Sequence, residues 1–385
     1  MRSGRREIVV VGGSVAATTA CDALRQEGHD GPITVLSEEA YAPYVRPPLS
    51  KAVLKGTEGA ESVFMSALPA GVTLRTGARA ASLDTARRRV LLADGEEVPY
   101  DGLVLATGAR ARRLGTSLGE RVVRDLDDAL ALRDRLATAR SAVIVGGGFL
   151  GMEIASSARS LGVEVTVVDR DPHLVRQFGR DLAARMAAAA TAEGVRLVRD
   201  EDGVELLGDR EITGVRTGSG AVHEADVVIT AVGCRPNVEW LDGTGLATPA
   251  GVTVDSRCRV RPDIVAAGDL AARPHGPAGP RRTPHWANAL DQARSAAAAL
   301  VRGDEAPVHR PRPFFWTEQW GLDIKIAGEI RPGTELSVLD GSLRDADALL
   351  QWTLDGRPVA AGTVNRRVPV GRLHRLAATE PVPAA

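Results

Sequence analysis

Two short stretches rich in apolar residues, at 7–11 and 141–145, each end in a glycine-rich turn and lead into an alanine-rich stretch. After the turns, residues 15–27 and 149–161 carry apolar side chains at the spacing of a helix. Short continuous apolar runs are typical of strands that are buried in a parallel sheet. The order of strand, tight turn and helix therefore predicts the start of a βαβ unit twice in one chain.

The same order of elements continues after both turns, and a different pattern begins near residue 310. From there apolar and polar residues alternate, which predicts a small α+β domain. The arginine-rich segment 110–113 interrupts the first unit and indicates a boundary. The predicted fold class is α/β, with two doubly wound Rossmann-like units and the small α+β domain. The further elements predicted are strands at 33–37, 100–108, 163–168, 225–233 and 264–269, and helices at 180–193 and 285–302.

The two turns carry the chemistry of dinucleotide binding. The second has the full G-x-G-x-x-G spacing in Gly146, Gly148 and Gly151, whereas the first has Gly12 with Ser14 and Ala17 at the other two places. Small residues let the backbone approach a pyrophosphate, and the helix N-terminus offers it N–H donors. A single turn of this kind could also be a tight connection that binds nothing. Two of them in one chain indicate two dinucleotides, typically FAD and a nicotinamide.

Acidic residues follow the second strand of each unit, where a carboxylate accepts hydrogen bonds from ribose hydroxyls. These residues are Glu38 and Glu39 in the first unit and Asp169 in the second. A carboxylate at residue 169 repels a 2′-phosphate and favours NADH over NADPH. The neighbouring Arg170 would pair with that phosphate, so the choice of coenzyme stays open, and Asp169 could also be an ordinary strand cap.

Composition narrows the classes of function. The net charge of −1 gives no overall field that would attract nucleic acid or an anionic membrane. The cysteines, Cys21, Cys234 and Cys258, lack C-x-x-C spacing, which argues against a disulfide framework, a metal cluster and a redox-active dithiol. No apolar run approaches the length of a membrane span, and the first residues lack a signal-peptide core. We expect a cytoplasmic protein without a metal site.

The stretch Pro43-Tyr-Val-Arg-Pro-Pro-Leu-Ser-Lys51, which follows the first turn, resembles the FAD-dependent NADH:ferredoxin reductases of bacterial oxygenase systems. That family is part of the pyridine nucleotide-disulfide oxidoreductase superfamily and lacks the redox dithiol. Further matching segments run in family order along nearly the whole chain. They are Ala106-Thr-Gly108-Ala-Arg110, Gly146–Glu153, Gly233-Cys-Arg-Pro-Asn237, Ala267-Gly-Asp269, His285-Trp-Ala-Asn288, Phe315-Trp-Thr-Glu-Gln319 and Leu322–Gly328.

The resemblance implies a discontinuous FAD-binding domain (1–111 and 234–308), an inserted NADH-binding domain (112–233) and a C-terminal domain (309–385). It places Lys51 beside the flavin N5 and Glu153 near Lys51 and the nicotinamide. A cation near N5 stabilises negative charge on reduced flavin. Without the resemblance, Lys51 is a solvated loop lysine and Glu153 a residue that suits a helix N-terminus.

The resemblance also implies a set of cofactor contacts. Asp269 would bind the ribityl chain, Arg46 and Arg124 the FAD phosphates or adenine side, and Trp286 would bring its backbone close to the isoalloxazine. Trp316 would border the flavin, although a tryptophan is more often part of a core than a cofactor neighbour, and Trp240, Trp320 and Trp352 are assigned to packing. Pro284 stands where family members often have glutamate. The remaining predicted contacts are Gly13, Ala16, Ala80, Ala106, Thr107, Gly108, Gly268, His285 and Ala287 for FAD, and Gly147, Phe149, Leu150, Val232 and Gly233 for NADH.

The route of the electrons is also implied by family likeness. Dithiol-type relatives carry a cysteine pair where this chain has residues 47–50, so electrons would leave the flavin directly for an external acceptor. The implied acceptor is a small iron–sulfur ferredoxin that serves a monooxygenase or dioxygenase. The alternatives are an NADH oxidase or quinone-type reductase, and a signalling flavoprotein resembling apoptosis-inducing factor. A basic docking face would favour the ferredoxin. Its candidate residues are Arg75, Arg79, Arg312, Arg366 and Arg367.

Overall fold

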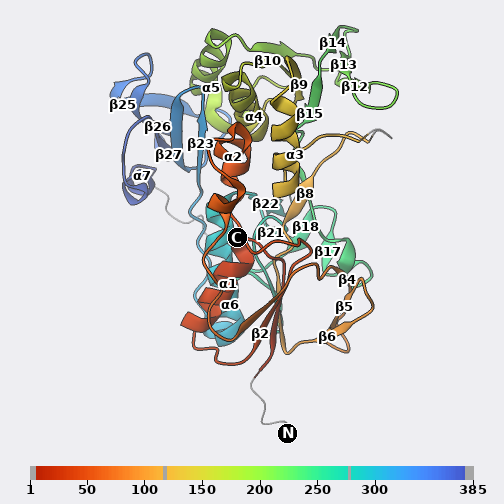
Figure 1. The fold of residues 1–385 in the computed structure, drawn as a ribbon. Helices are drawn as coiled ribbons and strands as arrows, with labels where there is room; N and C mark the ends of the chain where they lie inside the picture. The colour runs from red at the N-terminus through yellow and green to blue at the C-terminus, as the bar shows by residue number, and fades with distance from the viewer. Residues whose placement is uncertain (1–5, 116–118, 276–278, 378–385) are drawn as a thin grey trace.

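A computed structural model describes residues 6–115, 119–275 and 279–377 of the chain. Its first sheet has the strand order β19-β20-β7-β1-β2-β3 and lies in the lower half of Figure 1. Strand β20 pairs in parallel with β7, although the whole second sheet separates them in sequence. The sheet is therefore built from two segments of the chain. Its strands are β1 (Ile8–Val11), β2 (Ile33–Leu36), β3 (Val72–Arg75), β7 (Gly102–Leu105), β20 (Ile264–Ala266) and the antiparallel β19 (Arg259–Arg261).

Both faces of this sheet are buried, which explains its continuous apolar runs. Val10, Val104 and Val265 share a core with helices α1 (Val15–Gln26) and α6 (Trp286–Arg302). Val9 and Leu103 point to the other face and pack with short strands. These strands are β4 (Ala80–Asp84), β5 (Arg89–Leu92), β6 (Glu97–Pro99), β17 (Ala247–Thr248), β18 (Gly251–Thr253) and β21 (Ala271–Arg273), and β21 pairs with β22 (Arg281–Arg282).

The second sheet, in the upper half of Figure 1, is parallel and has the order β11-β10-β9-β15. Ile144 faces the helices of this unit, whereas Val143 faces a small antiparallel sheet. The helix predicted over 180–193 begins earlier and is interrupted at Gly179 (φ 72°, ψ 177°). The elements are β9 (Ser141–Val145), β10 (Glu164–Asp169), β11 (Arg196–Arg199), β15 (Val227–Thr230), α3 (Leu126–Leu136), α4 (Phe149–Ser160), α5 (Val175–Ala192), β12 (Val204–Leu207), β13 (Gly214–Thr217) and β14 (Val222–Glu224).

The two chain crossings between these sheets pair with each other. Strand β8 (Ala109–Ala111) is antiparallel to β16 (Cys234–Pro236). The expected boundary at 110–113 therefore begins in a short two-stranded ribbon. The exact domain boundaries stay a prediction.

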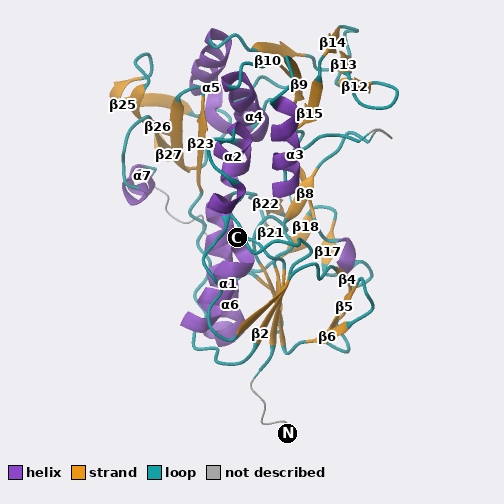
Figure 2. Ribbon diagram, viewed as in Figure 1, coloured by secondary structure: helices purple, strands orange, loops and turns teal. Residues whose placement is uncertain are grey.

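A third, antiparallel sheet has the order β23-β24-β27-β26-β25 and lies at the upper left of Figure 2. One of its faces, with Ile324, Ile326 and Leu350, belongs to a large core, while Ala327 and Leu349 pack with Leu373. It consists of β23 (Phe314–Gln319), β24 (Leu322–Gly328), β25 (Glu335–Ser342), β26 (Asp347–Leu354) and β27 (Arg357–Val364), followed by α7 (Val370–Leu376).

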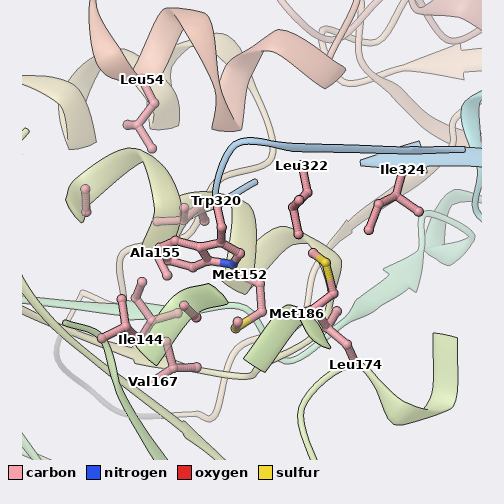
Figure 3. Close-up of a cluster of buried hydrophobic side chains, with 14 of the residues drawn as sticks. Leu54, Ile144, Met152, Ala155, Val167, Leu174, Met186, Trp320, Leu322 and Ile324 are labelled. Carbon is pink, nitrogen blue, oxygen red and sulfur yellow. The ribbon is translucent and has the colours of Figure 1, made fainter. Parts of the chain in front are cut away.

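One hydrophobic core joins the three parts (Figure 3). Leu54 from α2 (Ala52–Lys55), Met152 from α4, and Leu322 and Ile324 from β24 all belong to it. Trp320 is 9% exposed and contributes to this core. The assignment of Trp240, Trp320 and Trp352 to packing is confirmed. Within the described residues, no helix combines the length and the apolar character that a membrane crossing needs.

Candidate functional site: two glycine turns and a buried ion pair

The first glycine turn lies between the carboxyl ends of three strands. Gly12 has φ +126°, which glycine tolerates and other residues rarely adopt. A Cβ on Gly12 would lie 2.1 Å from the carbonyl oxygen of Ala106, which follows β7. A Cβ on Gly13 would lie 2.2 Å from the Oγ of Ser37, which follows β2. The backbone therefore requires glycine at residue 12, and packing against the Ser37 side chain disfavours any larger residue at 13.

The turn also contacts the predicted Gly268-Asp269 segment. Gly268 has φ +86°, and a Cβ on it would lie 3.1 Å from the Cβ of Ala16. The Gly268 N–H donates to the Oε1 of Gln292 at 3.0 Å. Ser14 is the N-cap of α1, but its side chain makes no capping hydrogen bond, and Ala17 is fully buried. Small residues from both segments of the first sheet thus meet at one helix N-terminus.

The second turn has the same construction. Gly146 has φ +109°, and a Cβ on it would lie 3.3 Å from the backbone nitrogen of Val232. A Cβ on Gly151 would lie only 1.8 Å from the carbonyl oxygen of Gly146, so α4 packs directly on the turn. Gly148, the N-cap of α4, differs, since the nearest atom to an added Cβ is the Nε2 of Gln177 at 3.6 Å. Packing within the protein does not explain why residue 148 is glycine.

The acids after β2 are already engaged with basic and phenolic groups. The Oε1 of Glu39 lies 2.5 Å from the Nη2 of Arg46, and Glu39 also accepts a hydrogen bond from the Tyr44 hydroxyl. Glu38 is exposed and faces Arg79 at 3.6 Å. Glu39 is therefore held within the protein, and Glu38 is the freer of the two carboxylates.

Asp169, at the end of β10, contacts the second turn directly. Its Oδ2 accepts a hydrogen bond from the Gly147 N–H at 2.6 Å. The neighbouring Arg170 is 70% exposed and lies 3.9 Å from Asp171. Burial lowers the pKa of His173, which packs beside Gly147. Asp169 is thus fixed at the turn, whereas Arg170 points to solvent.

A chain of polar contacts connects the predicted FAD residues Arg46, Arg124 and Asp269. The Nη1 of Arg46 donates to the Arg124 carbonyl oxygen at 2.6 Å. The Nη2 of Arg124 lies 2.9 Å from the Oδ2 of Asp269. The Nε of Arg124 is buried and has no hydrogen-bond partner among the described residues.

The structure brings Lys51 and Glu153 together. The Lys51 Nζ lies 2.8 Å from the Glu153 Oε2, and the two side chains are 14% and 8% exposed. Lys51 also donates to the Pro47 carbonyl oxygen at 3.1 Å. An ammonium group has three N–H donors, so one of them stays available beyond these two contacts. Because Lys51 belongs to the first unit and Glu153 to α4, the pair joins the first unit to the second.

An aromatic cluster surrounds the start of α4. The ring centroids of Phe149 and Phe315 are 5.0 Å apart, and His285 stacks on Phe315 at 5.3 Å. Burial lowers the pKa of His285, which favours its neutral form. Trp286 and Trp316 form an edge-to-face pair at 5.7 Å. The predicted aromatic residues therefore lie where the C-terminal sheet meets both other units.

The other predicted residues occupy the ends of elements near the two turns. The Thr107 hydroxyl donates to the Asn237 carbonyl oxygen at 2.7 Å, so it is engaged within the protein. A Cβ on Gly108 would lie 3.7 Å from the Nη2 of Arg124. Ala80 begins β4, Leu150 and Ala287 lie in the first turns of α4 and α6, and Gly233 (φ +100°) follows β15.

Sequence reasoning missed two hydroxyl groups that bind the Glu153 carboxylate. The Ser50 Oγ donates to Oε2 and the Thr317 Oγ1 donates to Oε1, both at 2.6 Å. Ser50 lies inside the recognised motif and was an available candidate. Thr317 is 164 residues from Glu153 in sequence, and no local pattern indicates their contact.

Both turns fit a bound dinucleotide. The first N–H groups of a helix need acceptors, and neither Ser14 nor Gly148 supplies one from its side chain. The N-terminus of a helix favours phosphate oxygens, and glycine at residue 148 allows their close approach. The unpartnered Nε of Arg124 offers a further donor beside the first turn. These donors suit FAD at the first turn and NADH at the second.

Two glycine turns of this kind, one in a mostly parallel sheet and one in a fully parallel sheet, define a protein that binds two dinucleotides. The chain belongs to the pyridine nucleotide-disulphide oxidoreductase family, whose model matches residues 6–293. It is thus an oxidoreductase, and FAD and NADH are its cofactors. Its three cysteines are all free, and none lies at residues 47–50.

Within this family, the chain is similar to reductases of bacterial electron-transfer systems. The chain is 35% identical to the biphenyl dioxygenase system ferredoxin–NAD(+) reductase component of Paraburkholderia xenovorans, over 93% of this chain and 90% of that one. It is 36% identical to rhodocoxin reductase of Rhodococcus erythropolis, over 93% and 86%. The covalent putidaredoxin reductase–putidaredoxin complex contains a chain with a TM-score of 0.86 and 29% identity, over 97% and 93%. The predicted family and fold class are confirmed.

Proposed function

We propose that the protein is an NADH:ferredoxin oxidoreductase that supplies electrons to an oxygenase system. The observation that carries the proposal is which residues lie where the first unit meets α4, a region that we call the junction. A buried Lys51–Glu153 pair lies there, beside Pro47-Pro48-Leu49-Ser50. Because this segment has no thiol, electrons have no disulfide route and must pass to an external acceptor. The similar proteins named as ferredoxin reductases support the same acceptor class.

The residues of the chain divide the work in this proposal. The redox chemistry would come from bound FAD, which can take two electrons as hydride and give them up one at a time. Asp169 accepts hydrogen bonds from the ribose of NADH, while the backbone at residues 146–148 holds its phosphates. Lys51 places a positive charge at the junction, and Glu153 fixes the position of that charge. The neutral His285 and the aromatic cluster exclude water from the same region.

The proposal includes a basic surface on which an acidic ferredoxin docks. Ion pairs within the protein reduce the number of arginines that could form this surface. Arg75 pairs with Glu96 at 2.6 Å, and Arg366 pairs with Asp340 and Asp347. Such pairs contribute little net charge to a surface. Arg79 likewise faces a carboxylate, which leaves Arg312 and Arg367 as the preferred candidates.

Steady-state turnover separates the candidate functions. The assay follows NADH-dependent reduction of cytochrome c with and without putidaredoxin, and oxygen uptake in parallel. We expect strong dependence on the ferredoxin, and Arg312→Glu should lower kcat/KM for it more than Arg75→Gln does. Fast oxygen uptake without ferredoxin would favour an NADH oxidase. Negligible turnover with every acceptor, quinones included, would favour a signalling flavoprotein. A cytoplasmic location belongs to the proposal, since the cytoplasm supplies NADH.

A further inference from the structure

The Glu153 carboxylate receives donors from parts of the chain that are distant in sequence. Ser50 and Lys51 approach its Oε2 from the first unit, at 2.6 and 2.8 Å. Thr317 approaches its Oε1 from β23 of the C-terminal sheet, at 2.6 Å. Glu153 itself belongs to α4, so three units of the protein meet at this one side chain.

The direction of the Thr317 hydrogen bond follows from its neighbours. The Trp320 indole N–H can only donate, and it lies 3.0 Å from the Oε1 of Gln319. The other end of that amide, Nε2, therefore donates to the Thr317 Oγ1 at 2.9 Å. This leaves the Thr317 hydroxyl proton for the Glu153 Oε1. The Trp320 backbone N–H also donates to the Ser156 Oγ on α4 at 2.9 Å. This bond anchors Trp320, the last residue in this series of hydrogen bonds, to α4.

We propose that Thr317 is a positioning residue through which the C-terminal sheet fixes the charge on Lys51; the inference rests on the proposed function. Thr317 is fully buried and its hydroxyl satisfies one carboxylate oxygen of Glu153. A buried charged acceptor is less stable once it loses a donor. Without the Thr317 hydroxyl, the negative charge on Glu153 is therefore less well stabilised and balances Lys51 less well. The net positive charge at the junction then rises and stabilises reduced flavin.

The experiment measures the two-electron midpoint potential of the flavin in the intact holoenzyme. Thr317→Val removes the hydroxyl at nearly constant volume, and Thr317→Ser keeps it. We expect Thr317→Val to raise the equilibrium constant for flavin reduction about threefold to tenfold, a positive shift of up to about 30 mV. Thr317→Ser should restore the wild-type value. In a Glu153→Gln background, Thr317→Val should add no further shift.

Thr363 supplies a matched control. It is also fully buried in the C-terminal sheet, and its hydroxyl has no hydrogen-bond partner among the described residues. Thr363→Val should leave the potential unchanged. Should Thr317→Val fail to fold, Ser50→Ala removes the other hydroxyl donor and should shift the potential in the same direction.

Two results would overturn the inference. One is an unchanged potential in Thr317→Val, or in Ser50→Ala where that variant replaces it, while Glu153→Gln shifts it. The other is a shift in Thr317→Ser as large as in Thr317→Val, which would trace the effect to packing. Failure of the proposed function looks different, because the wild-type flavoprotein would then not deliver electrons from NADH to a ferredoxin at all.

Discussion

Replacement of Lys51 by methionine tests the junction most directly. Methionine keeps much of the length of the lysine side chain but removes its charge. Glu153, 8% exposed, would then hold a buried carboxylate without its cationic partner. Glu153→Gln in the same chain removes that uncompensated charge and supplies the paired comparison.

The structure sets the size of the effect. Breaking a buried ion pair from one side costs about 3–5 kcal/mol. Glu153 keeps its hydrogen bonds from Ser50 and Thr317, each worth about 1 kcal/mol, so we expect a loss at or just below the lower limit of that range, about 2–3 kcal/mol. Loss of a preorganised charge beside the reacting groups typically costs about 10²-fold in rate, and we expect a similar loss in flavin reduction by NADH.

Urea unfolding of the apoprotein measures the first quantity, and stopped-flow reduction of the holoenzyme measures the second. Lys55 is the control, since it lies exposed at the end of α2, four residues after Lys51. Lys55→Met should change neither quantity. The double variant Lys51→Met, Glu153→Gln should regain most of the stability but not the rate. If Lys51→Met behaves like Lys55→Met in both assays, the junction has no role in stability or in hydride transfer.

Three further predictions concern the turns and the pH dependence. Asp169→Ala should narrow the preference for NADH over NADPH about tenfold, because the variant lacks the carboxylate that binds ribose hydroxyls and repels a 2′-phosphate; an unaltered ratio would place the discrimination elsewhere. Gly148→Ala should weaken NADH binding and leave thermal unfolding unchanged, whereas Gly151→Ala should also destabilise the fold by about 1–3 kcal/mol, since its Cβ meets backbone at 1.8 Å. Burial lowers the pKa of His309 to about 4. The unfolded chain, with the ordinary histidine pKa of about 6.5, takes up the proton first as the pH falls. The free energy of unfolding should therefore decrease between about pH 6.5 and 4, by up to about 1.4 kcal/mol per pH unit, and His309→Gln should flatten this slope.

Local signals in the sequence predicted most of the elements around the two turns. The helix predicted over 15–27 is Val15–Gln26, and that predicted over 149–161 is Phe149–Ser160. These ends are readable because each helix starts at a glycine turn whose backbone angles other residues rarely adopt. The helix predicted over 180–193 begins at Val175 in the structure. Gly179 interrupts its regular geometry, so the residues before Gly179 were not recognised as part of the helix.

The sequence did not predict which distant segments pair with each other. Strand β8 is Ala-Arg-Ala and has no apolar pattern, so its existence depends on β16, which lies beyond the whole second sheet in sequence. The same holds for the candidate site. Lys51 and Glu153 were found because they occur in recognisable motifs, whereas the contact of Thr317 with Glu153 depends on how the third sheet docks.

That docking explains why the junction needs three parts. The two glycine turns fit the phosphates of two dinucleotides, yet neither turn contains Lys51 or Glu153. Glu153 is oriented from one side by Ser50 and from the other by Thr317. If the proposed role of Lys51 holds, the electrostatics of this junction are part of what the chain contributes to flavin reduction. The C-terminal sheet would then act on the first half of the reaction through Thr317, in addition to any part it has in docking an acceptor.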